Sequence, residues 1–168
     1  MKKILKRNNM IQKLRIEIKW AVLFALMMLS WMLMEEIFGL HKKYINYQAT
    51  VSMLVAIPAI AMYVFALFEK RKKYYDGKMS YSQGLVSGIW ITIFYTLLSP
   101  AVQIITVQII SPEYFENVIK YVVENNQMKL QEAIDFYNLE NFIITTLWSS
   151  FVMGIVTSLI ISIFTRKK

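Results

Sequence analysis

The chain has 168 residues, of which 57% are hydrophobic, and it carries a net charge of +8 with no cysteine and one histidine. This hydrophobic content leaves no room for a separate soluble domain, and the absence of cysteine excludes disulfides, thiolate chemistry and cysteine-based metal sites. The basic residues come without an aromatic platform or a groove-reading helix, so no nucleic-acid binding is expected.

Four apolar runs are long enough to cross a bilayer, whose core of about 30 Å requires about 20 helical residues. They cover residues 20–40, 50–68, 85–110 and 142–164. No charge interrupts 20–34 or 53–68, whereas helices of a soluble bundle carry polar residues along one face. We therefore expect an all-α fold, a four-helix transmembrane bundle that forms one domain over 1–168; a soluble bundle is the weaker alternative.

A basic lead-in, residues 1–19, mixes apolar and charged residues and predicts an interfacial helix continuous with the first crossing. The crossing itself is long and is not followed by an Ala-x-Ala-like cleavage site, which favours an uncleaved helix over a signal peptide.

Glu35 and Glu36 are the only charges that the predicted crossings enclose. A carboxylate in lipid costs about 3 kcal/mol on insertion scales, which makes the pair a candidate for a proton relay or ion site. Their place in the last turns favours instead a pair that water reaches and that meets Lys42 or Lys43. Because adjacent helical residues point about 100° apart, the two carboxylates are not expected to converge on one substrate atom. His41 is interpreted as an interfacial residue, not a metal ligand.

The second crossing contains Pro58, which predicts a bend, and the segment Glu69–Lys78 with its Asp76-Gly77 turn signal predicts a cytoplasmic loop. A long helix-compatible stretch then runs from Ser80 to Ile110, and Pro100 is expected to kink it. The connection 41–48 is short, so the first two crossings are expected to be antiparallel neighbours.

Small and polar residues recur every three or four positions along the third crossing, and they predict a seam between helices. The candidate polar stripe consists of Thr92, Thr96, Ser99, Gln103 and Thr106, which follow Gly84 and Gly88. The stripe predicts either a hydrophilic path, with Gln103 beside the Pro100 kink, or ordinary helix packing, and packing is favoured. Similar stripes on the second crossing (Ala49, Ser52, Ala56, Ala59, Tyr63, Ala66) and the fourth (Thr146, Ser150, Gly154, Ser158, Ser162) are expected to face it.

A hydrophilic insert at 111–141 separates the third and fourth crossings and holds six of the eleven acidic residues. Ser111-Pro112-Glu113 predicts a helix start with Ser111 as the cap, and Asn125-Asn126 predicts a break. We expect two short amphipathic helices on the outer face.

Basic residues set the predicted topology. Seven of the nineteen precede the first run, five lie between the second and third, and three end the chain, whereas Lys42, Lys43, Lys120 and Lys129 lie on the other side. Cytoplasmic loops retain such residues, so a multi-pass membrane protein with both termini cytoplasmic is expected. The basic flanks suit anionic lipid head groups.

The stretch Tyr75-Asp76-Gly77-Lys78-Met79-Ser80-Tyr81, followed by Gln83-Gly84 and Gly88, carries a family resemblance. It resembles a family of small four-helix bacterial inner-membrane proteins, common in Bacteroidota and catalogued as domain of unknown function four-one-nine-nine. The insert Ser111–Asn141 and the basic tail from Arg166 agree with that pattern, although a single Gly77 stands where paired glycines are usual. The resemblance covers the layout of the whole chain and implies a fold and a location, without an activity or catalytic residue.

Three classes of function remain open. The composition of the exposed parts favours a non-enzymatic accessory protein that binds a protein partner, and the alternative is a small transporter or channel formed by a homo-oligomer around the polar stripe. An enzyme is the weakest hypothesis, because the chain has no Gly-x-Ser-x-Gly elbow, His-Glu-x-x-His pair or phosphate loop. No catalytic residue, cofactor or metal site is therefore expected.

Overall fold

The computed structural model describes the backbone of residues 2–167 and the side chains of residues 14–167. A 3-10 turn, Met53–Val55, joins the second helix to the third, and a π-helical turn, Thr106–Ile110, extends the fourth. The helices in chain order are α1 (Lys2–Ile37), α2 (Ile45–Ser52), α3 (Ala56–Tyr74), α4 (Tyr81–Ile105), α5 (Tyr114–Glu124), α6 (Leu130–Phe136) and α7 (Leu139–Thr165).

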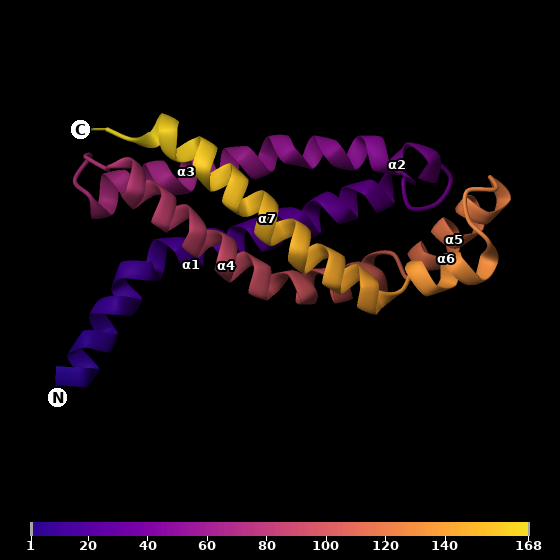
Figure 1. Ribbon diagram of the computed structural model, residues 1–168, viewed down its shortest axis with the longest axis horizontal. Coiled ribbons are helices and arrows are strands. Elements are labelled where there is room, and N and C mark those ends of the chain that lie inside the picture. Colours follow the sequence, from indigo (N-terminus) through magenta and orange to yellow (C-terminus); the bar gives the residue numbers. More distant parts are fainter. Residues whose placement is uncertain (1, 168) are drawn as a thin grey trace.

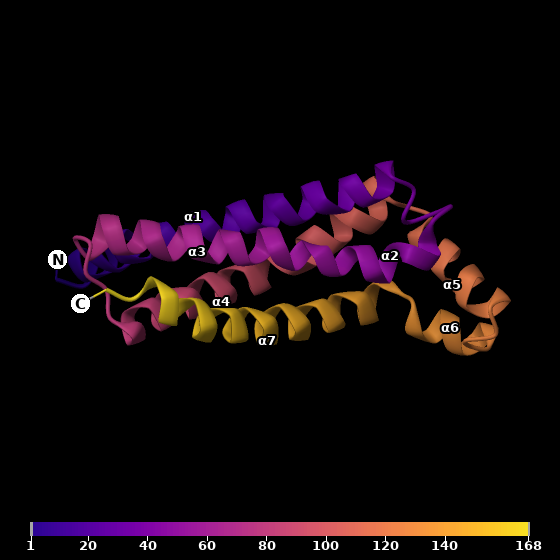
Figure 2. The same cartoon turned by 90° about the horizontal axis from the view of Figure 1, so that it is seen from above.

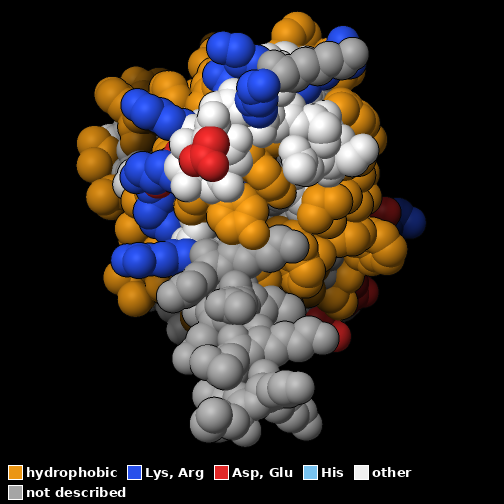
Figure 3. Space-filling model, turned by 90° about the vertical axis from the view of Figure 1, so that its left-hand side faces the viewer, with side chains coloured by type: hydrophobic (Ala, Val, Ile, Leu, Met, Phe, Trp, Pro, Cys, Tyr) orange, Lys and Arg blue, Asp and Glu red, His pale blue; other side chains and the backbone are white. Residues whose placement is uncertain are grey.

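The four long helices, α1, α3, α4 and α7, run along the length of an elongated bundle, and α5 and α6 cover one end of it (Figures 1 and 2). We call this end the insert end. The two chain ends lie at the opposite, terminal end (Figure 1). Figure 3 shows Lys and Arg side chains gathered on the face of the terminal end.

Among the described residues, four helical stretches are long and apolar enough to cross a membrane: Leu14–Ile37, Ile45–Tyr74, Tyr81–Ile110 and Leu139–Thr165. Large apolar side chains cover their outer surfaces, for example Ile57 on α3, Leu97 on α4 and Trp148 on α7, each more than two thirds exposed. Lipid accommodates such surfaces, whereas water does not. The all-α fold is as predicted, and the chain is a membrane protein.

α4 and α7 cross closely because small residues stand opposite each other. Gly88 of α4 faces Ser158 of α7, where an added Cβ would lie 2.5 Å from the serine Oγ, and Gly84 faces Ser162. Gly154 of α7 lies against the Thr92 side chain. A Cβ added at Gly154 would lie 2.8 Å from the Tyr63 hydroxyl of α3. The three predicted stripes therefore meet at this crossing, as close packing of helices in lipid requires.

Both prolines are accommodated within helical structure. Pro58 lies in the first turn of α3, directly after the 3-10 turn, where its missing N–H is tolerated. Pro100 lies inside α4 without ending it. Since Pro100 cannot donate to the carbonyl of Thr96, the Ser99 hydroxyl donates to that carbonyl instead, at 2.9 Å.

Three boundaries differ from prediction. The first crossing ends at Ile37 and not at residue 40, since Gly39 adopts a left-handed φ of 75°. The predicted loop Glu69–Lys78 is helical as far as Tyr74, because its side chains pack back on α1 and α7, and only 75–80 turn. The helix predicted from Ser111 begins at Tyr114, because the Ser111 side chain contacts α1 and does not cap.

Other boundaries agree with the sequence. Helix α1 is continuous from Lys2 to Ile37, which confirms that the lead-in continues into the first crossing. The insert forms two short helices with the break at Asn125-Asn126, where Asn126 has a φ of 53°. Ser80 caps α4 through a reciprocal capping box with Gln83.

Candidate functional site

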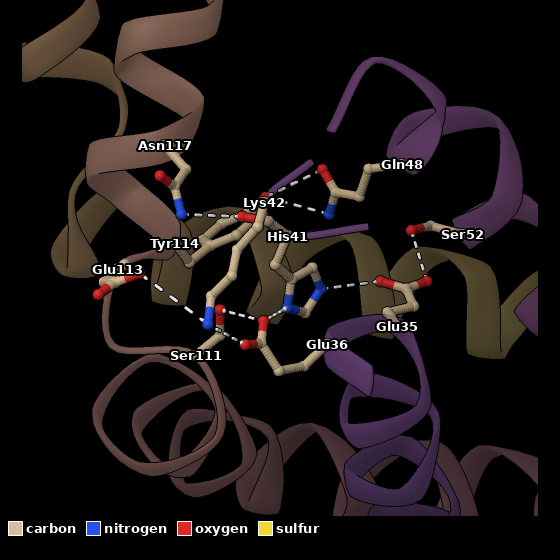
Figure 4. A network of polar contacts seen from close by, with 10 residues as sticks. All are labelled: Glu35, Glu36, His41, Lys42, Gln48, Ser52, Ser111, Glu113, Tyr114 and Asn117. Atoms are coloured by element: carbon tan, nitrogen blue, oxygen red, sulfur yellow. Dashed lines mark hydrogen bonds and ion pairs between the residues drawn. The ribbon is translucent and has the colours of Figure 1, made fainter. Parts of the chain in front are cut away.

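Glu35, Glu36 and His41 form the centre of a polar network at the insert end (Figure 4). Helix α1 ends in a Schellman turn. The Gly39 N–H donates to the Glu36 carbonyl, and the Leu40 N–H donates to the Glu35 carbonyl. The left-handed conformation of Gly39 makes this turn possible. The turn places His41, six residues after Glu35, beside both carboxylates.

Glu35 is fully buried and accepts hydrogen bonds from three elements of structure. Trp31 Nε1 donates from the preceding turn of α1 at 2.5 Å, and the Ser52 hydroxyl donates from the end of α2 at 2.7 Å. The third contact joins Glu35 Oε2 to His41 Nε2 at 3.1 Å. These partners stabilise a carboxylate that burial alone would disfavour.

Glu36 faces the other side of the imidazole. It accepts from Lys42 Nζ at 2.7 Å and from the Ser111 hydroxyl at 2.9 Å, and its Oε2 lies 3.5 Å from His41 Nδ1. The hydrogen bond with Glu36 raises the pKa of the Lys42 ammonium group. With 15% of its side chain exposed, Glu36 lies at the edge of the network, between buried Glu35 and water.

The segment after α4 positions α5 on this network. The π-helical turn closes with a bond from Ser111 N–H to the Thr106 carbonyl at 2.7 Å, and it directs the buried Ser111 hydroxyl to Glu36. Tyr114 then packs edge-on against the His41 ring, with centroids 5.1 Å apart, and Asn117 Nδ2 donates to the His41 carbonyl at 3.1 Å. Burial raises the pKa of the Tyr114 hydroxyl, which Gln48 of α2 contacts at 3.2 Å.

These contacts correct the sequence-based interpretation in two respects. Glu35 was expected to be reached by water, yet it is completely buried, because the Schellman turn and α2 cover it. The two carboxylates were expected to diverge, and they do, but the imidazole lies between them and contacts each through a different nitrogen. Glu36 meets Lys42, one of the two predicted partners. The glycine four residues after Glu35 was the available signal for this turn.

The candidate polar stripe of α4 lies largely inside the bundle. Thr92, Ser99, Gln103 and Thr106 are buried and Thr96 is half-buried. The hydroxyls of Thr92 and Thr106 donate to carbonyls of their own helix, Thr92 also bonds the Tyr63 hydroxyl at 2.7 Å, and Thr96 bonds Ser150 at 3.3 Å. Within the described part of the chain, Gln103 Oε1 has no hydrogen-bond partner. Helix packing thus accounts for the hydroxyls of the stripe, and Gln103 remains the exception.

A lateral groove of about 290 Å³ opens between α3 and α7, which lie close at the terminal end and separate toward the insert end (Figure 1). Small residues line both walls, including Ala56 and Ala59 on α3 and Ser150 and Gly154 on α7. Tyr95 of α4 also lines the groove. It is 5% exposed, and its hydroxyl takes part in no hydrogen bond among the described residues.

A second buried charge pair lies at the terminal end, and sequence reasoning missed it. Glu17 of α1 contacts Lys70 Nζ of α3 at 2.7 Å and accepts from the Ser87 hydroxyl of α4 at 2.8 Å, and both charged side chains are 2% exposed. The Lys70 ammonium also lies 4.0 Å from the centroid of the Tyr74 ring. Among residues 14–167, no three His, Cys, Asp or Glu side chains gather as a metal site would require.

The family model described as "Protein of unknown function (DUF4199)" matches residues 19–167, which include the last three candidate spans, all but the first five residues of the span Leu14–Ile37, and the whole polar network. The chain belongs to this family. The match confirms the resemblance inferred from the stretch around Gly77 and the insert. No curated protein and no solved structure matches the chain.

Proposed function

We propose that this DUF4199 protein is a non-enzymatic accessory protein of the bacterial inner membrane, which binds a transmembrane helix of a partner protein in the lateral groove between α3 and α7. Both termini then lie in the cytoplasm, because most Lys and Arg residues lie toward the terminal end, and that end contacts anionic lipid head groups. The insert end faces outward.

The groove and its unpaired hydroxyl carry the proposal. Transmembrane helices associate through small residues that allow close approach and through hydrogen bonds between polar side chains, and the groove offers both. The Tyr95 hydroxyl needs an acceptor within the hydrocarbon region, where acyl chains have none. A helix with a polar side chain at that depth supplies one.

Photo-crosslinking in native membranes tests the proposal. A photoreactive residue at Ala59 or Met153, both in the groove, should crosslink to another membrane protein, whereas one at exposed Leu97 on α4 should not. Ala59→Trp fills the groove and should abolish the Met153 crosslink without lowering the thermal stability of the protein. Crosslinks to lipid alone, or equal crosslinks from Leu97, would contradict partner binding in this groove.

A small oligomeric transporter or channel is the second candidate, and buried Gln103 Oε1, which lacks a hydrogen-bond partner, is the observation that favours it. Liposomes that contain the protein should then show solute flux that Gln103→Leu abolishes. Flux that persists in Gln103→Leu, or a strictly monomeric particle without flux, would leave accessory binding as the proposal.

A further inference from the structure

His41 Nδ1 is a buried polar atom that has no hydrogen bond to any residue that the structure describes. The side chain is 1% exposed, and the nitrogen lies 3.5 Å from Glu36 Oε2, too far for a well-formed hydrogen bond. Buried polar atoms in native structures are nearly always paired, and each exception calls for an explanation. The explanation depends on how many protons the ring carries.

The carboxylate of Glu35 determines where the first ring proton lies. An ionised carboxylate only accepts hydrogen bonds, so with Glu35 in this form its 3.1 Å contact through Oε2 places a proton on His41 Nε2. In the neutral ring, Nδ1 then carries a lone pair that points toward a second carboxylate, that of Glu36. A second proton, placed on Nδ1, converts this unfavourable contact into a charge-assisted hydrogen bond.

We propose that His41 Nδ1 is a proton-binding site that takes up one proton from the aqueous phase at the insert end. One N–H bond forms, no bond breaks, and the proton enters past Glu36, the partly exposed carboxylate. Histidine is the side chain whose charge commonly changes between about pH 5 and 8, so the experiment below covers this range. This inference is independent of partner binding in the lateral groove.

The charged and titratable groups around the ring favour this assignment. Glu35 and Glu36 face the two ring nitrogens from α1, and the neutral Tyr114 hydroxyl comes from α5. Among residues 14–167, the cation that contacts these carboxylates is Lys42, which lies 2.7 Å from Glu36 and 3.9 Å from Glu113. Two carboxylates therefore face the imidazole directly, and the ammonium group is directed to the carboxylates.

Proton uptake is linked to the attachment of α5. Glu36 connects α1 to Ser111, which precedes α5, and Tyr114 of α5 packs on the same imidazole. When Nδ1 carries a proton, it donates to Glu36 and closes the 3.5 Å gap, so the contacts between α1, the turn at His41 and α5 strengthen together. The α5–α6 insert is held more firmly in the protonated state.

Because His41 is the only histidine, ¹⁵N-histidine labelling of the full chain, purified with a histidine-free tag into nanodiscs, reports this ring alone. From about pH 8 to about pH 5, we expect Nε2 to remain protonated and Nδ1 to change from bare to protonated. A neutral ring with the proton on Nδ1, or two unchanged signals across this range, would overturn the proposal.

Variants and a second readout sharpen the test. Glu36→Gln should move the Nδ1 transition to lower pH, whereas Glu113→Gln, whose side chain is 65% exposed and reaches only Lys42, should move it less. In the cysteine-free chain, a spin label at Lys120→Cys on α5 should lose mobility on acidification. Equal transitions in wild type and Glu36→Gln, or a label whose mobility ignores pH, would overturn the link to α5.

Discussion

The two ends of the bundle each bury a glutamate of α1 against a cationic or basic side chain, but they solvate the pair differently. At the terminal end, Glu17 and Lys70 are both 2% exposed, Ser87 donates to Glu17, and the Lys70 ammonium lies over the Tyr74 ring. At the insert end, Glu35 is equally buried, but His41 connects it to Glu36 and Lys42, which water reaches.

Because the two charged sites differ in their exposure to water, we expect them to play different roles. A lysine and a glutamate at 2.7 Å, each only 2% exposed, form a fixed connection between α1 and α3. In the proposed protonation, the imidazole between two carboxylates, one of them partly exposed, takes up a proton from solvent. The terminal end is therefore expected to contribute constant stability, and the insert end to respond to conditions.

The largest expected effect is the loss of the fixed pair. Lys70→Met leaves the Glu17 carboxylate buried, with Ser87 as its remaining partner among the described residues, and removal of one member of a buried pair costs about 3–5 kcal/mol. Thermal unfolding in detergent should show this loss. The double variant Glu17→Leu/Lys70→Met should recover most of it, since apolar residues replace buried ion pairs at little cost. A double variant no more stable than Lys70→Met would mean that the pair does not act as a unit.

A matched pair of serines compares the ends directly. Ser87 donates to Glu17 at 2.8 Å and Ser111 donates to Glu36 at 2.9 Å, and hydrogen bonds to charged groups contribute about 1.5–3 kcal/mol. Ser87→Ala should lose an amount within this range, because no water replaces the hydroxyl beside buried Glu17. Ser111→Ala should lose less, because water reaches Glu36. Equal unfolding free energies for the two variants would remove the proposed difference in solvation.

Sequence periodicity predicted the parts of the fold that depend on local pattern. The four crossings follow from run length, and the meeting of Gly88, Thr92 and Gly154 follows from small residues at spacings of three and four. The break at Asn126 and the cap at Ser80 are likewise local signals. Such features depend on residues within one or two helical turns, so a single sequence contains them.

The charged sites could be predicted only in part. Glu35 and Glu36 stood out as enclosed charges, but their burial depends on a turn at Gly39 and on contacts with Ser52 and Ser111. Glu17 and Lys70 lie 53 residues apart, in segments that were interpreted as a basic lead-in and a loop. A charge pair between distant helices leaves no periodic signal, and only the three-dimensional arrangement reveals it.

Alkaline pH should lower the contribution of the insert end to the unfolding free energy more than that of the terminal end. Burial raises the pKa of Tyr114 at the insert end. At the terminal end, Tyr75 is less buried, and its pKa is raised by burial and by the nearby Tyr74 and Glu17. Because the folded state retains these protons to higher pH, their contribution is complete below the ordinary value of 10.0 and is lost as pH rises above it. Each group lowers the unfolding free energy by at most about 1.4 kcal/mol per pH unit. Tyr114→Phe should flatten this decline more than Tyr75→Phe.

The smallest effects are expected from the exposed cations. Lys42 contacts Glu36 and Lys19 contacts Glu69, and about half of each lysine side chain is exposed. Exposed pairs contribute about 0–1 kcal/mol and weaken with salt, so Lys42→Met and Lys19→Met should each lose no more than this, and the loss should shrink in about 1 M salt. Glu69 keeps Trp20 and Lys73 as partners, and Glu36 keeps Ser111, so both carboxylates remain solvated or paired. A much larger, salt-independent loss for Lys42→Met alone would mean that Lys42 is effectively part of the buried network, and that the insert end is as fixed as the pair between Glu17 and Lys70.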